Sequence, residues 1–250
     1  KTPKTPPLRL RHLAAACALL VAASAALGCK SGRPARSRGV SNLDERPLIT
    51  SSFSETFDRP LSQSDWNDTS TGSYRVENGT LRIKGAYNHP LWLLKRLPRD
   101  VQIDLDITSH DAAGDLKVEF FGDGVSFAPD KGQYTSSGYV AIFGGWHNTT
   151  STLVRQFEHD PNRRERTDLR VVPGQTYHWT IKREGTKVSW AIDNAPFLEI
   201  QDLQPLYGTS HWFFGFDNWE VDTTVDNLRI SALAPSAPAL PVEDPATAGR

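Results

Sequence analysis

The sequence predicts an all-β protein, built as a two-sheet antiparallel sandwich over residues 51–233. Apolar and polar residues alternate with a period of two through the middle of the chain, and no convincing helical period appears. Short turn sequences separate the alternating runs. Successive side chains of a strand point to opposite faces, so such runs suit sheets with one inner and one outer face. Many short strands without helices favour an antiparallel sandwich.

Several strands are clear in the sequence itself. Residues 101–107 and 116–120 alternate without a break, and a Gly-Asp-Gly turn follows the second run. Residues 177–182 and 187–192 flank Glu184-Gly185, which predicts a hairpin with a short turn. Further strands are expected at 74–76, 80–84, 91–94, 138–143, 152–157, 212–216 and 225–231.

The first 28 residues have the composition of a secretory signal, with a basic head, a short apolar core and small residues before a cut site. The apolar core is shorter than the ~18 residues that span a bilayer. Ala26-Leu27-Gly28-Cys29 resembles the bacterial lipobox, which implies cleavage before Cys29 and acylation of its thiol. We therefore expect a lipoprotein of the bacterial cell envelope, held by the lipid bilayer. Lys30 after the cysteine favours the outer membrane, and plain secretion is the alternative.

Composition describes the rest of the chain. The composition of residues 29–50 predicts a lipidated cysteine followed by a flexible tether. That of residues 234–250 predicts a disordered Ala/Pro-rich tail. Cys17 lies in the signal, so the mature domain has no internal disulfide and depends on its core. After the signal the chain carries 24 basic and 29 acidic residues. This mildly acidic balance argues against a nucleic acid partner, and we expect a monomer.

The order of several landmarks is similar to that of a known superfamily. These landmarks are Phe57-Asp58, Trp66, 74–81, Gly138-Tyr139-Val140, Phe214-Gly215-Phe216 and 226–230. The series resembles the concanavalin A-like lectin/glucanase superfamily, which includes laminin-G-like modules and the 3-keto-disaccharide hydrolase domain. The resemblance covers about residues 53–231. It implies a jelly roll whose first and last strands are adjacent, with ligands on the concave face or its rim loops; fold alone does not decide function.

Two tryptophan-containing loops are candidate sugar-binding sites. Trp146, His147 and Asn148 follow two glycines, and Asn218 and Trp219 follow a presumed core strand. Sugars are bound by an aromatic face and by planar polar groups, and both loops offer these. If the strand before Trp219 is central, the two loops could share one rim. The alternatives are a turn whose tryptophan caps the core, and a hydrophobic plug beside a solvated turn.

A third candidate set lies on alternating strand positions. If Val118 and Val140 face the core, Glu119 and Tyr139 share the opposite face of that sheet, an aromatic surface that suits a ligand groove. Arg155 would add a cation there. The alternative is an ion pair of Arg155 with Glu119 or Glu158.

Other chemistry is weakly indicated. Retaining glucanases of the superfamily carry Glu-x-Asp-x-Glu, but residues 102–106 have Gln102 at the nucleophile position, so we reject a glucanase site there. Calcium is possible, because acids in turns could supply oxygen ligands, but no calcium-loop motif appears. The candidate oxygen ligands are Asp58, Asp111, Asp115, Asp123, Asp130 and Asp226.

Three functions follow. The first is a membrane-anchored, extracytoplasmic lipoprotein whose sandwich binds carbohydrate without catalysis. The second is an enzyme acting on glycosides, hydrolase or lyase, with Glu119, His147, Arg155 and His159 as candidate catalytic groups. The third is a structural or protein-adhesion module. An acid/base pair that converges on one cleft would favour the enzyme, and an apolar rim would favour adhesion.

Overall fold

A computed structural model describes residues 35–36, 39–131 and 134–236. The predicted signal, Cys29 and most of the predicted tail lie outside these residues. Within the described ranges no helix is long and apolar enough to cross a membrane. The only helical segments there are η1 (Leu43–Glu45) and α1 (Gly145–Asn148), each less than two turns long.

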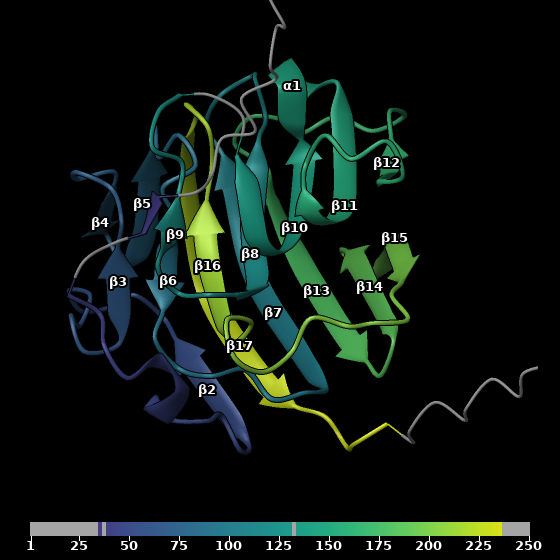
Figure 1. Ribbon diagram of the computed structural model, residues 1–250. Helices are drawn as coiled ribbons and strands as arrows, with labels where there is room; N and C mark the ends of the chain where they lie inside the picture. Colours follow the sequence, from purple (N-terminus) through teal and green to yellow (C-terminus); the bar gives the residue numbers. More distant parts are fainter. Residues whose placement is uncertain (1–34, 37–38, 132–133, 237–250) are drawn as a thin grey trace, which may run out of the picture. The chain divides into compact units, whose positions relative to one another are not determined.

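The described part of the chain forms two main antiparallel sheets, which Figure 1 shows as stacked layers. The first is a seven-stranded sheet with the order β12-β11-β10-β8-β16-β6-β3. Its strands are β3 (Trp66–Asp68), β6 (Leu91–Leu93), β8 (Leu116–Gly122), β10 (Thr135–Gly144), β11 (Thr150–Phe157), β12 (Arg164–Arg166) and β16 (Phe213–Asp217).

The second is an eight-stranded sheet with the order β15-β14-β13-β7-β17-β5-β4, and β2 also pairs with β17. Its strands are β2 (Ser52–Glu55), β4 (Tyr74–Glu77), β5 (Thr80–Lys84), β7 (Val101–Ser109), β13 (Thr176–Glu184), β14 (Lys187–Ile192), β15 (Ala195–Gln201) and β17 (Asp222–Ala232). The pairing of β2 with β17 confirms that the first and last strands of the sandwich are adjacent. A separate small ladder joins β1 (Ala35–Arg36) to β9 (Ser126–Phe127).

The core lies between the sheets and is built from alternate residues of facing strands. In β7, Ile103 and Leu105 face inward, while Asp104 between them is only partly buried. The indoles of Trp179 and Trp190 pack 4.4 Å apart in the same core. Each large buried side chain contributes about 1.5–3 kcal/mol of hydrophobic stabilisation. Packing of this kind therefore holds together a domain that has no internal disulfide.

The domain begins earlier than the sequence predicted. Residues 43–50 were expected to belong to the tether, but Ile49 is buried and its N–H donates to the carbonyl of Arg96. The indole N–H of Trp212 donates to Asp44 Oδ1 at 2.6 Å. Residues 43–50 therefore belong to the sandwich, because an apolar residue and a carboxylate in this segment find partners on it.

Every strand that the alternation predicted is present, and β15 is the longest strand that it missed. A two-residue turn, Asp193-Asn194, joins β14 to β15, with φ values of 52° and 66°. Such left-handed turns match the twist of a hairpin and favour Asp, Asn and Gly. The Asp-Asn pair between apolar runs was therefore a signal for this hairpin. Pro196 is compatible with β15 because the strand forms the edge of its sheet.

The predicted orientation of β10 was wrong. Tyr139, Ala141 and Phe143 belong to the core between the sheets, whereas Val140 and Ile142 form a separate cluster on the outer face. Residues 139–143 are apolar throughout, so alternation could not distinguish the two faces. The register decides the orientation, because it places Val140 opposite Glu119 and Ile142 opposite Lys117.

Candidate active site

A pocket of about 490 Å³ opens on the outer face of the seven-stranded sheet, at the end where β10 passes into α1. Its volume lies in the usual range for small-molecule sites. Six connections and two strands, β8 and β10, contribute to its wall. The lining residues are Asn88, Ala113, Asp115, Lys117, Lys131, Ile142, Gly145, Trp146, His147, Glu158, His159, Trp219, Glu220 and Val221.

The pocket joins the two tryptophan loops that the sequence singled out. Trp146 and His147 enter from the β10–β11 connection, and Trp219 enters from the β16–β17 connection. The expectation that these loops share a rim is confirmed by their place in one pocket. Antiparallel strands explain it, because β10 and β16 flank β8 and both run in the opposite direction to it. Their outgoing connections therefore emerge at the same edge of the sheet.

Trp146 is presented by a left-handed backbone turn. The φ angles of Trp146, His147 and Asn148 are 50°, 57° and 60°, a conformation that costs roughly 1–2 kcal/mol per residue for side chains other than glycine. The preceding Gly144 has a φ of 68°, and a Cβ there would lie 2.5 Å from Asn148 Oδ1. Strain of this kind persists only where surrounding contacts hold it, and it gathers at functional sites.

Asn148 supplies the contacts that hold the turn. Its amide donates to the carbonyls of Val171 at 2.8 Å and Ala112 at 3.1 Å, and its oxygen accepts the N–H of Val171 at 2.8 Å. Asn148 does not line the pocket. The sequence proposed it as a ligand-binding residue; in the structure its polar atoms serve the backbone, so it positions Trp146 instead.

Asn218 plays the same part for the second loop. It is fully buried, accepts the N–H of Ala86 at 3.0 Å and donates to the carbonyl of Val221 at 2.8 Å. It was also proposed as a ligand-binding residue, but it is buried and does not line the pocket. Trp219 next to it is partly exposed, and its ring meets that of Tyr87 edge-on at 5.2 Å.

The floor of the pocket holds a buried lysine, which the sequence analysis did not include among its site residues. Lys117 is 2% exposed, and its ammonium lies 2.5 Å from Asn88 Oδ1, 3.1 Å from Glu158 Oε2 and 3.2 Å from Asp217 Oδ2. Burial alone would lower the pKa of Lys117, but the carboxylates of Glu158, Asp217 and Asp115 outweigh burial and raise it. Lys117 therefore stays protonated. In the sequence, the alternation of Lys117 with the apolar Val118 was the one sign that Lys117 faces away from the core.

Titratable groups of the wall converge on the same space. Burial raises the pKa of Asp115, whose Oδ2 accepts the N–H of Trp219 at 2.5 Å. Glu158 Oε1 lies 3.7 Å from His159 Nε2, and the His159 ring packs 5.5 Å from that of Trp146. Carboxyl groups beside an imidazole are groups that acid/base chemistry uses.

Glu119 lies outside the pocket. It is 0% exposed, and its Oε1 accepts the N–H groups of Ser137 and Gly138, both at 3.0 Å. Its Oε2 accepts the hydroxyl of Tyr134 at 3.2 Å. Burial raises the pKa of Glu119 to about 7. The proposed catalytic acid thus anchors Tyr134 and the first residues of β10, which lie over it.

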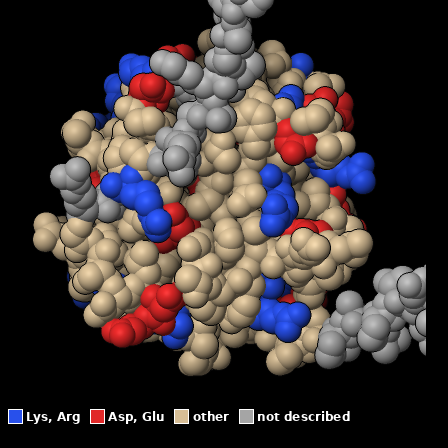
Figure 2. Space-filling model, in the orientation of Figure 1, with Lys and Arg blue, Asp and Glu red and all other residues tan. Residues whose placement is uncertain are grey.

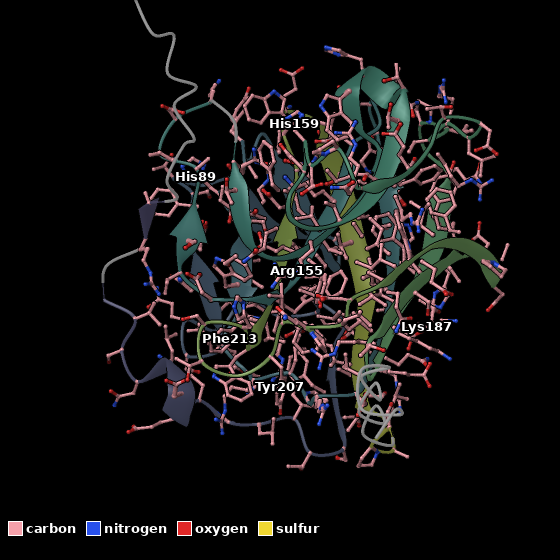
Figure 3. The ribbon with its side chains drawn as sticks, turned by 45° about the vertical axis from the view of Figure 1, so that its right-hand side comes forward. His89, Arg155, His159, Lys187, Tyr207 and Phe213 are labelled. Carbon is pink, nitrogen blue, oxygen red and sulfur yellow. The ribbon has the colours of Figure 1, made fainter. Side chains whose placement is uncertain are left out.

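Tyr139 and Arg155 are also placed away from the pocket. The Tyr139 hydroxyl donates to Asp202 Oδ2 at 2.6 Å, and Arg155 Nε pairs with the same oxygen at 3.1 Å. The expected ion pair of Arg155 exists, but with Asp202 in place of Glu119 or Glu158. Figure 3 shows Arg155 well separated from His159, which lies nearer the α1 end of the molecule.

The run at 102–106 lies on the other sheet. Asp104 accepts hydrogen bonds from Gln102 and Thr180, and Asp106 contacts His178 at 2.7 Å, all on the outer face of β7 and β13. Among the described residues no group of three or more His, Cys, Asp or Glu side chains could hold a metal ion. Figure 2 shows basic and acidic side chains side by side on a mostly uncharged surface, consistent with paired surface charges.

Comparison with known proteins identifies the fold. No family model and no curated protein sequence matches the chain. A solved structure from work on endo-acting O-glycanases of the human gut microbiota matches with a TM-score of 0.53 and 11% identity, covering 73% of this chain and 99% of its own. A Bacillus licheniformis β-glucanase matches with a TM-score of 0.51 and 8% identity, covering 74% and 100%. The fold is concanavalin A-like.

A further concanavalin A-like structure, the alginate lyase Aly36B, matches with a TM-score of 0.50 and 13% identity, covering 76% of this chain and 100% of its own. At such identities the likeness concerns the arrangement of strands. It confirms the two-sheet jelly roll, and the side chains of the pocket carry the argument on function.

Proposed function

We propose that this domain binds carbohydrate in the pocket between Trp146 and Trp219. The observation that carries the proposal is the meeting of two indoles from separate loops with carboxylate, imidazole and ammonium groups in one concave site. Aromatic faces stack on the C–H surface of sugars, and the charged groups accept or donate hydrogen bonds to hydroxyls. The concanavalin A-like structures compared above act on glycans, which supports the same ligand class.

A glycan array with the protein lacking residues 1–29 tests the proposal. Trp146→Ala and Trp219→Ala are expected to abolish the binding that the parent shows, with folding intact by circular dichroism. Trp212→Ala is the matched control, because Trp212 is a partly exposed tryptophan that bonds Asp44 outside the pocket. Binding unchanged in both pocket variants would place the site elsewhere, and a silent array would favour the protein-adhesion module.

Catalysis on a glycoside is the second candidate, favoured by the convergence of Asp115, Glu158 and His159 on the pocket. In this mechanism one carboxyl would donate a proton to the leaving oxygen and another group would accept one. The glycan selected by the array is incubated with the protein, and new reducing ends or unsaturated products are measured. Turnover lost in Glu158→Gln with binding retained would establish the enzyme; binding without turnover supports the non-catalytic function.

We propose further that Cys29 anchors this domain to the bacterial envelope as an acylated residue. The lipobox-like sequence before Cys29 supports this. Labelled palmitate incorporated into the parent but not into Cys29→Ser would support the anchor, and equal labelling of both would contradict it. Fractionation of inner and outer membranes then tests the expected outer-membrane location.

A further inference from the structure

We propose that the pocket receives the end of a saccharide chain, or a short free saccharide, and not the interior of a polymer. This inference rests on the carbohydrate-binding function proposed above. It follows from what covers the rest of the outer face of the seven-stranded sheet. An internal segment of a polymer needs an open path along or across the sheet, with exits on two sides of the bound sugar.

The sheet register defines two neighbouring rows of outward-facing residues. One row crosses β16, β8 and β10 at Asp217, Lys117 and Ile142, and Lys117 and Ile142 of this row line the pocket. The next outward row crosses β6, β16, β8 and β10 at Trp92, Gly215, Glu119 and Val140. An open groove would continue from the first row over the second.

The second row is closed by Trp92. Its side chain is 0% exposed although it points away from the core cluster, and a Cβ at Gly215 would lie only 2.9 Å from Trp92 Cε3. A Cβ at Gly122 would lie 2.3 Å from Trp92 Cη2. The two glycines therefore let the indole lie close against the sheet. Its N–H donates to the carbonyl of Ser126 in β9 at 3.0 Å, which fixes the indole against that strand.

Tyr134, which directly precedes β10, completes this closure. Tyr134 is buried above Glu119, and Glu119 holds the backbone of Ser137 and Gly138 through the bonds described above. The ammonium of Lys117 lies 5.8 Å from the centre of the Tyr134 ring. The pocket floor at Lys117 thus ends directly against a buried aromatic side chain.

The side of the pocket toward β11 is closed by the connection between β11 and β12. Glu158 reaches Lys117, and Arg163 donates to the carbonyl of Glu158 at 3.0 Å. The guanidinium of Arg163 stacks 4.8 Å from the ring centre of Trp146, on which His159 also packs. A sugar between Trp146 and Trp219 therefore meets walls on these two sides, so its chain cannot continue over the sheet in either direction.

The first test measures affinity against chain length. Isothermal titration uses glucose oligomers with α-1,4, β-1,3 and β-1,4 linkages and β-1,4 N-acetylglucosamine oligomers, each from one to six units. For any series that binds, affinity is expected to level off by the second or third unit, changing less than about twofold thereafter. Affinity that keeps rising to six units would overturn end binding alone. No binding in any series would count against the carbohydrate-binding function itself, and so separates the two failures.

The second test opens the closed row. Tyr134→Ala removes the ring next to Lys117, whereas Tyr134→Phe keeps the ring and loses only the hydroxyl bond to Glu119. In folded Tyr134→Ala the affinity is expected to rise again with longer oligomers, while Tyr134→Phe keeps the parent's plateau. A rise in both variants, or a plateau in both, would contradict the assignment of Tyr134 as the barrier.

Discussion

Lys117 Nζ lies 3.1 Å from Glu158 Oε2, and this contact joins the floor of the pocket to its wall. The two residues are 41 positions apart in the chain, and both side chains are largely withdrawn from water. Buried charges need a partner, because removing one leaves the other without solvation or compensation. The position of Glu158 in the pocket therefore depends on the ammonium beneath it.

Replacing Lys117 by methionine should lower the free energy of unfolding by about 3–5 kcal/mol, because it leaves the Glu158 and Asp217 carboxyls without a cation. Urea unfolding at pH 7 measures the loss. Lys187→Met is the matched control, since the Lys187–Glu199 pair is about half exposed and such pairs contribute about 0–1 kcal/mol. If Lys117→Met lost no more free energy of unfolding than the control, the buried ion pairs of Lys117 would not stabilise the domain.

The buried carboxyl of Glu119 should make the free energy of unfolding depend on pH. Burial raises its pKa to about 7, above its usual value of 4.5, so the folded state holds the proton more tightly than the unfolded chain. Its contribution is fully present below about pH 4.5 and is lost as pH rises through 7. The loss from this group amounts to about 3 kcal/mol at most. Urea unfolding at several pH values between 4 and 8 measures it.

Glu119→Gln isolates this effect from other titrating groups. The glutamine oxygen can still accept the N–H groups of Ser137 and Gly138, and its amide can donate to the Tyr134 hydroxyl oxygen. The variant should therefore match the parent near pH 4.5 and lose less stability on the way to pH 8. Parallel pH profiles for the two proteins would show that Glu119 does not titrate in this window.

Asn148 should affect ligand binding without touching the ligand. Asn148→Ala removes its bonds to Val171 and Ala112 and places alanine at a φ of 60°. Asn148→Gly removes the same bonds but tolerates the left-handed backbone. Both should weaken glycan binding, and alanine should lower stability more than glycine, by roughly 1 kcal/mol. Wild-type affinity in a folded Asn148→Ala would show that Trp146 does not need this turn.

Arg155 is expected to be dispensable for the ligand. Its guanidinium pairs with Asp202, outside the pocket, and its side chain is 43% exposed. Arg155→Ala should therefore leave glycan affinity unchanged and cost at most about 1 kcal/mol of stability. Glu158→Ala is the comparison within the pocket and should weaken binding. The affinities of both variants are measured by titration; a loss in Arg155→Ala equal to that in Glu158→Ala would return Arg155 to the site.

Part of the site could be predicted because its signals are local. Trp146, His147 and Trp219 stand in turns just after apolar strands, and such positions face the edge of a sheet. Lys117, Asp115 and Glu158 gave no comparable signal, since a single charged residue in a strand or a turn is usually a solvated one. They became site residues through contacts between segments far apart in the chain.

Side-chain alternation and turn chemistry were enough to predict the strands, their turns and the two-sheet sandwich, because both act between neighbouring residues. The outward face of β10 follows instead from its pairing with β8, since residues 139–143 are apolar on both sides and the register selects one. Tertiary packing also places Trp92, Tyr134 and Glu119 so that they close the sheet beside the pocket. Burial by a returning segment depends on contacts across the whole domain, and a local pattern does not encode such contacts.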